Sequence, residues 1–184
     1  MIELVRGAPG VCLVAILVAH PALAGENPAG RTTTGNIGDA LEIVMPLISL
    51  SAAVAQEDWE GAQEFGVGLA STIATTYVLK QSINKTRPDG RDRDSFPSSH
   101  TAVVMHASTF IHERYGWRWA VPMYVATAFV GHSRIHDERH DEQDVLAGAV
   151  IGYVAARYFT TTYKGVRVQA AVDTDFIGVT FSLR

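Results

Sequence analysis

The chain has 184 residues, which is enough for a single domain with a hydrophobic core and too short for two domains of ordinary size. Hydrophobic residues make up 47% and charged residues 18%, a composition that excludes an intrinsically disordered chain and a coiled coil. The net charge of −4 argues against a nucleic-acid-binding protein, and a single cysteine excludes an intrachain disulfide.

Residues 1–24 have the layout of a secretory signal peptide. Arg6 precedes a continuous apolar run over 11–18, and a small-residue frame follows at 22–24. The apolar run is shorter than the roughly 20 residues that span a bilayer, which disfavours the alternative of an uncleaved anchor. We therefore predict cleavage at this frame, with loss of Cys12 and export to the bacterial periplasm. A membrane-attached form is the alternative.

A helical domain is predicted over 39–163, after a flexible lead-in over 25–38 that is rich in Gly, Pro, Asn and Thr. Apolar residues at helical spacing place the helices, with Asn36 or Asp39 as the candidate cap of the first and Asp58 as that of the second. The connections are short, so we expect an all-α fold, a single bundle of about five to six helices. The helices are expected from Asn36 or Asp39 to about 56, over 58–86, after Pro97, after Gly116, and from about 141 to 159.

Four stretches of these helices are apolar enough to raise the question of membrane spans: 41–56, 61–79, 119–131 and 145–159. Each is shorter than a comfortable span or contains Glu, Gln or His. This pattern favours the core helices of a soluble or peripherally attached domain over an integral membrane protein.

The spacing of apolar residues changes in the tail over 164–184. Apolar and polar residues alternate over 166–173 and over 177–184, on either side of Thr174 and Asp175. Period-two alternation around a polar turn predicts a short C-terminal β-hairpin. The hairpin either packs one apolar face on the bundle or presents it to a membrane or a partner.

Three polar clusters between Lys80 and Asp144 carry the candidate chemistry. Lys80 and Arg87 are seven residues apart, so on one continuous helix they project from the same face as an anion clamp. Taken alone, such a pair is more typical of a solvated basic edge.

The second cluster is Pro97-Ser98-Ser99-His100, which directly precedes an apolar helical run. Proline followed by serine predicts a helix start that Ser98 or Ser99 caps. The unpaired N–H groups and the positive dipole end of a helix start bind phosphate-like anions, and His100 lies in the same turn. In isolation, the cluster is more typical of a plain cap with a surface histidine.

The third cluster contains Ser133, Arg134, His140 and Asp144. His140 and Asp144 are four residues apart, which predicts a carboxylate–imidazole hydrogen bond that fixes the ring tautomer. Arg134 adds a planar, permanently charged group suited to phosphate oxygens. Together the clusters supply three cations, a helix-terminus anion site and two histidines, which is the set that phosphoryl transfer needs.

The three clusters in this order resemble the tripartite signature of the type 2 phosphatidic acid phosphatase and vanadium haloperoxidase superfamily. The likeness covers 80–144 and favours the phosphatase branch. The resemblance implies that His140 attacks phosphorus to form a phosphohistidine, that Asp144 orients it, and that His100 is the general acid. It assigns the phosphate oxygens to Lys80, Arg87, Ser98, Ser99 and Arg134, without a metal ion or other cofactor.

One position departs from the family pattern, because glycine is usual where this chain has Ser99. A positive φ at this position would cost serine on the order of 1 kcal/mol. The backbone N–H is unchanged by the substitution, so we expect the anion site to be retained.

The resulting prediction is a metal-independent phosphatase acting on small-molecule or lipid phosphate monoesters, with a peripheral membrane contact and no nucleic-acid partner. Vanadate is expected to inhibit it. The alternative is a vanadium-dependent haloperoxidase that binds vanadate as cofactor in the same anion site. A zinc site at His132, His136 and His140 is a third hypothesis, and a non-catalytic bundle a fourth. The exact substrate and the oligomeric state are left open.

Overall fold

The structure is a computed structural model that describes residues 32–163, 167–173 and 176–182. The predicted signal peptide over 1–24 lies outside the described residues, as does the first half of the expected lead-in, 25–31. The side chains beyond residue 163 lie outside them as well.

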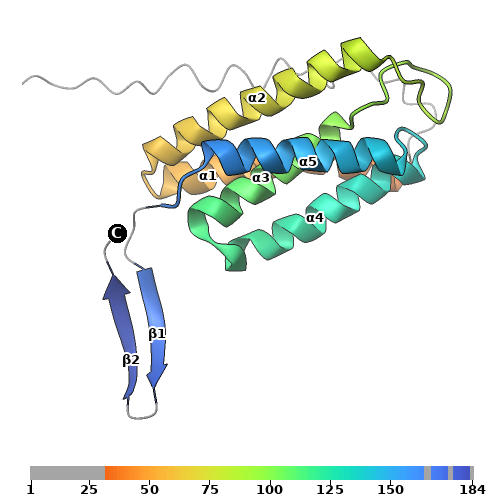
Figure 1. Cartoon of the computed structure of the whole chain (residues 1–184). Helices are drawn as coiled ribbons and strands as arrows, with labels where there is room; N and C mark the ends of the chain where they lie inside the picture. Colours follow the sequence, from red (N-terminus) through yellow and green to blue (C-terminus); the bar gives the residue numbers. More distant parts are fainter. Residues whose placement is uncertain (1–31, 164–166, 174–175, 183–184) are drawn as a thin grey trace, which may run out of the picture.

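Five helices form an elongated bundle in which successive helices run in opposite directions (Figure 1). Helix α3 is at the centre and packs against the other four helices. This all-helical architecture agrees with the sequence prediction. The helices are α1 (Thr33–Ala55), α2 (Trp59–Ile83), α3 (Ser99–Tyr115), α4 (Trp117–His136) and α5 (Glu142–Phe159).

Helix α1 starts earlier than the sequence indicated, so part of the predicted lead-in over 25–38 is helical. The hydroxyl oxygen of Thr32 accepts a hydrogen bond from the backbone N–H of Gly35 at 3.0 Å and caps the helix. The same hydroxyl donates to Asp137 at 2.6 Å, which ties the start of α1 to the turn after α4. A threonine cap of this kind is locally plausible in sequence, but the contact with Asp137 is a tertiary one.

The starts of α2 and α3 follow the predicted caps, Asp58 and Ser98. Helix α5 starts near its predicted position, where Asp141 caps it and Asp144 completes a capping box. Helix α2 ends at Ile83, about one turn before the predicted end.

Small residues let α5 lie directly on α3. A Cβ atom added to Gly148 would overlap the carbonyl oxygen of Ser98, and one on Gly152 would overlap that of Ala102. The buried core beside this contact includes Phe65 and Phe110, whose ring centroids are 4.9 Å apart. Other fully or nearly fully buried apolar side chains are Met45, Val104, Ala107 and Val130.

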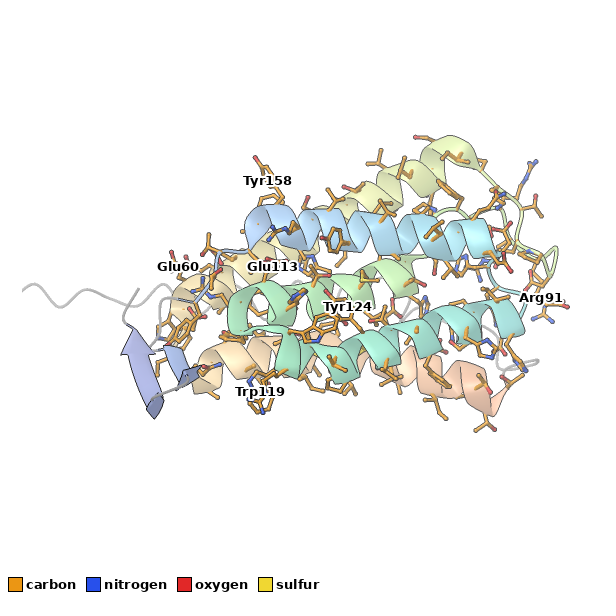
Figure 2. The ribbon with its side chains drawn as sticks, turned by 60° about the horizontal axis from the view of Figure 1, so that its bottom comes forward. Glu60, Arg91, Glu113, Trp119, Tyr124 and Tyr158 are labelled. Atoms are coloured by element: carbon orange, nitrogen blue, oxygen red, sulfur yellow. The ribbon has the colours of Figure 1, made fainter. Side chains whose placement is uncertain are left out.

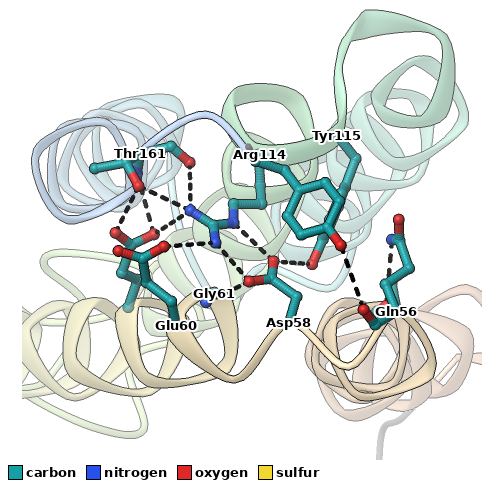
Figure 3. Close-up of polar contacts among 10 residues, drawn as sticks. Gln56, Asp58, Glu60, Gly61, Arg114, Tyr115 and Thr161 are labelled. Atoms are coloured by element: carbon teal, nitrogen blue, oxygen red, sulfur yellow. Dashed lines mark hydrogen bonds and ion pairs between the residues drawn. The ribbon is translucent and has the colours of Figure 1, made fainter. Parts of the chain in front are cut away.

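A buried ion-pair network closes the end of the bundle where α2 and α4 begin (Figure 3). Arg114 donates from Nε to Asp58 at 2.7 Å and from Nη1 to Glu64 at 3.1 Å and to the carbonyl oxygen of Thr161 at 3.0 Å. The hydroxyl group of Tyr115 donates to Asp58 at 2.8 Å. The network joins the α1–α2 connection, the end of α3 and the segment after α5.

The outer faces of the helices are apolar and the charges lie at the helix ends. No Asp, Glu, Lys or Arg occurs in 65–79 of α2, 119–133 of α4 or 145–156 of α5. We call the exposed aliphatic residues of these faces the apolar belt. Its members are Ile43, Val44, Leu47 and Ile48 of α1, Val67 and Val78 of α2, Val121 and Val125 of α4, and Leu146, Val150 and Val154 of α5.

An aromatic rim borders the belt at the end that carries Arg114. It consists of Trp59, Trp117, Trp119 and Tyr158, and Tyr158 is 82% exposed. Figure 2 shows Trp119 and Tyr158 toward the end of the bundle that holds Glu60, with Arg91 at the opposite end.

Helix α1 also departs from the expectation that every apolar stretch is too short or too polar for a span. Among the described helices, α1 has the length and apolar composition needed to cross a membrane. Its acidic residue Glu42, which counted against a span in the sequence, is buried inside the bundle rather than on the outer face.

Two strands follow the bundle, β1 (Arg167–Asp173) and β2 (Phe176–Ser182), and they pair antiparallel with Val168 opposite Phe181. The residues that connect them lie outside the described part of the chain. The hairpin with one apolar face on the bundle or on a membrane therefore stays a prediction.

Candidate active site

The sequence-predicted site residues meet at the end of the bundle opposite the Arg114 network. Lys80 lies in the last turn of α2, Arg134 in the last turn of α4, and Asp144 in the first turn of α5. Ser98, Ser99 and His100 form the start of α3, whereas Arg87 and His140 lie in the connections α2–α3 and α4–α5.

His140 is buried and held by a main-chain oxygen. Its Nδ1 lies 2.7 Å from the carbonyl oxygen of Ser95 and 3.7 Å from the nearest oxygen of Asp144. A carbonyl oxygen only accepts, so Nδ1 carries the proton and the neutral ring has its lone pair on Nε2. The predicted hydrogen bond between His140 and Asp144 is therefore wrong in its partner, because the backbone of Ser95 occupies that position.

The surroundings of His140 favour its neutral form. Burial lowers the pKa of His140 to about 4, and the positive charges of Lys80, His100 and Arg87 act in the same direction, while Asp144 opposes them. A neutral imidazole with a defined lone pair is the form that acts as a nucleophile.

Asp144 is fully buried and receives donors from three directions. The hydroxyl group of Ser95 donates to it in a short hydrogen bond, and Lys85 Nζ lies 2.8 Å from its other oxygen. The backbone N–H of Asp141 donates at 3.2 Å. Ser95 thus contacts His140 with its carbonyl oxygen and Asp144 with its hydroxyl group, so it links the two residues.

Lys85 and Ser95 lie at the site but were not predicted from the sequence. Lys85 also contacts Asp141, and the resulting carboxylate neighbours raise the pKa of Lys85 although burial lowers it. The carbonyl oxygen of Lys85 accepts from the N–H of Ser95 at 2.9 Å. Lys85 lies within the first motif and Ser95 between the first two motifs, and these positions are the sequence feature that could have pointed to them.

Lys80 and Arg87 both contact Asp94, but they do not project from one helix face as predicted. The expectation that both project from one helix face is wrong, because α2 ends at Ile83 and Asn84 adopts a left-handed conformation with φ of 48°. The following loop folds back instead. Arg87 Nε lies 2.9 Å from Asp94 Oδ1, and Lys80 Nζ donates to the Asp94 carbonyl oxygen in a short hydrogen bond.

Asp94 is ionised in this setting. Burial raises its pKa, but the hydrogen bond and the charge of Arg87, together with the nearby charge of Lys80, lower it below the usual value. Arg87 is therefore paired with an anionic carboxylate while Lys80 contacts the main-chain oxygen of the same residue, so Asp94 brings the two cations together.

The start of α3 confirms the predicted cap at Ser98. Its backbone N–H donates to the carbonyl oxygen of Asp144 at 2.9 Å, and its hydroxyl oxygen accepts from the N–H of Thr101 at 3.4 Å. Ser99 is the first residue of the helix and is not among the non-glycine residues with positive φ. The cost considered for serine at this position therefore does not arise.

His100 contacts two carboxylates from α1, a helix in which the sequence predicted no site residue. Its Nε2 lies 2.9 Å from Glu42 Oε2 and 3.2 Å from Asp39 Oδ1. Asp39 also accepts from Arg134 Nη1 at 2.6 Å, and Gly35 accepts from Arg134 Nη2 through its carbonyl oxygen at 2.8 Å. The carboxylates at an i, i+3 spacing in an otherwise apolar helix were the sequence feature that could have revealed this.

The geometry does not support the histidine-based zinc site. His140 is buried against Ser95, whereas His132 and His136 are exposed and their ring centroids are 6.0 Å apart. Within the described part of the chain, no group of three or more His, Cys, Asp or Glu side chains is arranged to hold a metal ion.

The assembled groups suit a tetrahedral oxyanion. A buried imidazole has a free Nε2, a second imidazole is held by carboxylates, and three cations and a helix N-terminus surround them. This arrangement allows transfer of a phosphoryl group to His140 and protonation of a leaving oxygen by His100.

Comparisons with known proteins agree with a site that binds a phosphate group. Residues 62–167 match the family model of the PAP2 superfamily. The chain is 26% identical over 182 residues to the lipid A 4'-phosphatase of Helicobacter pylori, covering 92% of this chain and 91% of the relative. It is 42% identical over 89 residues to the lipid A 1-phosphatase of Porphyromonas gingivalis, covering 47% of this chain and 20% of the relative. No solved structure matches the chain significantly.

Proposed function

Since this chain belongs to the PAP2 superfamily, we propose that it is a phosphatase that removes a phosphate monoester group from a lipid through a phosphohistidine on His140. The observation that carries the proposal is the contact between His140 Nδ1 and the Ser95 carbonyl oxygen, which leaves Nε2 as the nucleophilic nitrogen. The names of the two relatives, both lipid A phosphatases, support a lipid phosphate as substrate.

In the proposed reaction, Lys80, Arg87 and Arg134 neutralise the phosphate oxygens. The hydroxyl group of Ser98 and the backbone N–H of Ser99 complete the phosphate site. These groups stabilise the charge that develops on the phosphoryl oxygens in the transition state, and they do so without a metal ion.

The covalent step transfers the phosphoryl group to His140. The Nε2 lone pair of His140 forms a bond with phosphorus as the bond to the leaving oxygen breaks, and His100 gives that oxygen a proton. In the second step, His100 takes a proton from water, whose oxygen bonds to phosphorus as the P–N bond breaks. Inorganic phosphate leaves and His140 returns to its neutral form.

The apolar belt supports placement of the bundle in a lipid bilayer, with the site at one surface. The uncharged stretches of α2 and α4 are each about 22 Å long at 1.5 Å per residue, against a hydrocarbon core of about 30 Å. Tryptophan and tyrosine side chains prefer the membrane–water interface, which is where the aromatic rim would lie. Local thinning of the bilayer and snorkelling of flanking side chains accommodate a stretch that is shorter than the hydrocarbon core.

The proposed placement in the bilayer differs from the sequence prediction, which favoured a soluble or peripherally attached domain. It explains why large apolar side chains are exposed on α1, α2, α4 and α5 while the charged side chains gather at the two ends. It also brings the site to the depth of a lipid phosphate group. Export to the periplasm stays part of the proposal, and sequencing the N-terminus of the mature protein tests it.

The function is tested with the full chain in detergent micelles. We expect phosphate release from a lipid phosphate monoester in the presence of a chelator, inhibition by vanadate, and no release by the His140→Ala variant with unchanged helical content. Retention of full activity by that variant would refute the nucleophile assignment. Oxidation of halide with added vanadate and peroxide, without phosphate release, would instead support the haloperoxidase alternative.

The membrane placement has its own test. The expressed chain should stay in the membrane fraction through high salt and alkaline washes and be released by detergent. Release by salt or alkali alone would show a peripheral protein and contradict the placement.

A further inference from the structure

Two acidic residues of α1 enter the site from outside the region that matches the family model. The match covers 62–167, whereas Asp39 and Glu42 lie one helical turn apart near the start of α1. Glu42 is buried and lies 2.9 Å from His100 Nε2, and Asp39 lies 3.2 Å from the same nitrogen. Both carboxylates therefore meet the residue to which the proposed function assigns proton transfer.

The sequence of α1 is built for this close approach. A Cβ atom added to Gly38 would overlap the hydroxyl oxygen of Ser133 and crowd Arg134 Nη2, and one on Gly35 would overlap the carboxylate of Asp137. These glycines let α1 lie directly against the end of α4. Helix α1 is thus fixed at the site by tight packing and by the hydrogen bond from Thr32 to Asp137.

We propose that Glu42 is a positioning residue that holds the Nε2–H of His100, so that Nδ1 is the nitrogen that gives and takes the catalytic proton. This inference rests on the proposed function. A carboxylate accepts hydrogen bonds, so its contact with Nε2 requires a proton on that nitrogen. Asp39 assists from its position between His100 and Arg134.

The assignment gives a balanced proton transfer in both steps. In the first, doubly protonated His100 donates its Nδ1 proton to the leaving oxygen, which receives the electron pair of the breaking P–O bond. His100 is then neutral, still protonated on Nε2 and still bound to Glu42. Its free Nδ1 lone pair accepts a proton from the water that attacks the phosphohistidine, which restores the starting state.

The rate loss in a Glu42 variant should depend on the leaving group of the substrate if Glu42 positions His100. A purely structural role would lower the rate equally on all substrates. An alkyl phosphate needs protonation of its leaving oxygen, whereas p-nitrophenyl phosphate releases a stable phenolate without it. We expect Glu42→Gln to lower kcat about a hundredfold for an alkyl lipid phosphate and less than about threefold for p-nitrophenyl phosphate. His100→Ala should show the same selectivity, and the double variant should be no worse than His100→Ala alone.

Glu57→Gln is the matched control, because Glu57 is an exposed carboxylate just beyond the other end of α1. It should change neither rate. Equal losses on both substrates for Glu42→Gln, or losses that multiply in the double variant, would overturn the proposal. If wild-type protein hydrolyses neither substrate, the proposed function fails.

A tautomer measurement on the wild-type chain is independent of enzymatic activity, and it uses a variant for signal assignment alone. With ¹⁵N-labelled histidine in detergent micelles, the neutral form of His100 should be the tautomer protonated on Nε2, assigned by the signals that His100→Gln removes. A tautomer protonated on Nδ1 would overturn the proposed contact even if the enzyme is active.

Discussion

The imidazole of His140 donates a hydrogen bond to the carbonyl oxygen of Ser95 at 2.7 Å, and it lies 3.7 Å from the Asp144 carboxylate. The tautomer of the proposed nucleophile is therefore set by the main chain. Asp144 influences the orientation of His140 through Ser95, because the hydroxyl group of Ser95 donates to Asp144. Ser95 lies in the loop directly before the second motif, so one residue connects the conformation of that loop to the orientation of His140.

This relationship predicts a mild effect of Ser95→Ala. The substitution keeps the carbonyl oxygen and removes one donor from the buried Asp144 carboxylate. We expect a loss of about 1–3 kcal/mol in the free energy of unfolding and a decrease in kcat of less than about tenfold. Thermal unfolding and steady-state kinetics in detergent measure both. A loss of activity as complete as in His140→Ala would show that the hydroxyl group, and not the carbonyl oxygen, orients the nucleophile.

The low pKa of His140 predicts activity that extends into acid. Burial and the neighbouring cations lower this pKa to about 4, so the imidazole stays neutral down to that pH instead of protonating near its ordinary value of 6.5. On the acid side, kcat/KM for the free enzyme should therefore fall only as the pH approaches about 4. An acid limb centred near 6.5 in the pH profile would contradict the described environment.

Lys85 influences the pKa of His140 through its contact with Asp144. Its ammonium group lies 2.8 Å from Asp144 and offsets the negative charge that favours protonation of His140. In Lys85→Met the unopposed carboxylate should raise the pKa of His140 and move the acid limb to higher pH, with lower thermal stability. Lys85→Arg should restore both, and an unchanged acid limb in Lys85→Met would refute the coupling.

At the other end of the bundle, Arg114 should matter for stability and not for chemistry. Its side chain is 1% exposed and pairs with Asp58. Arg114→Met leaves a buried carboxylate without its partner, so we expect a loss of about 3–5 kcal/mol in the free energy of unfolding, with kcat unchanged for the folded fraction.

The matched control is Arg157→Met, which breaks the exposed pair with Glu113 and should cost less than about 1 kcal/mol. Denaturant titration in micelles separates the two variants. Equal stabilities would mean that the network of Figure 3 does not hold this end together.

Gly38→Ala tests the close packing of α1 on the site. The added methyl group would displace Ser133 and Arg134, so we expect KM for the phosphate substrate to rise at least several-fold. Ser51→Ala, at an exposed position of the same helix, should have no effect. A Gly38→Ala enzyme with unchanged KM would show that α1 does not shape the phosphate site.

The starts of α2 and α3 were predictable because their causes are local. Asp58 and Ser98 each cap the helix that follows them, and sequence alone identifies such residues. The helix end at Ile83 was not predictable in the same way, since it depends on the left-handed conformation of Asn84, and the relation between Lys80 and Arg87 was misjudged as a result.

The residues that meet at the proposed site were predictable from motif spacing, but the residues that contact and support them were not. Ser95 and Lys85 reach Asp144 across 49 and 59 residues of sequence, and Glu42 reaches His100 through the packing of α1. Long-range contacts of this kind leave no periodic pattern. The exposed apolar belt was also hidden, because apolar residues at helical spacing look the same whether they face a protein core or a lipid.

The most direct test of the proposed function is to trap the covalent intermediate. Brief mixing of the full chain with a ³²P-labelled lipid phosphate, followed by denaturation in alkali, should leave phosphate on the protein, because a phosphohistidine is stable to base and labile to acid. Mass spectrometry should place it on His140, and His140→Ala should remain unlabelled. Phosphate on another residue, or hydrolysis with no phosphoenzyme in rapid-quench experiments, would contradict the assignment of His140 as the nucleophile.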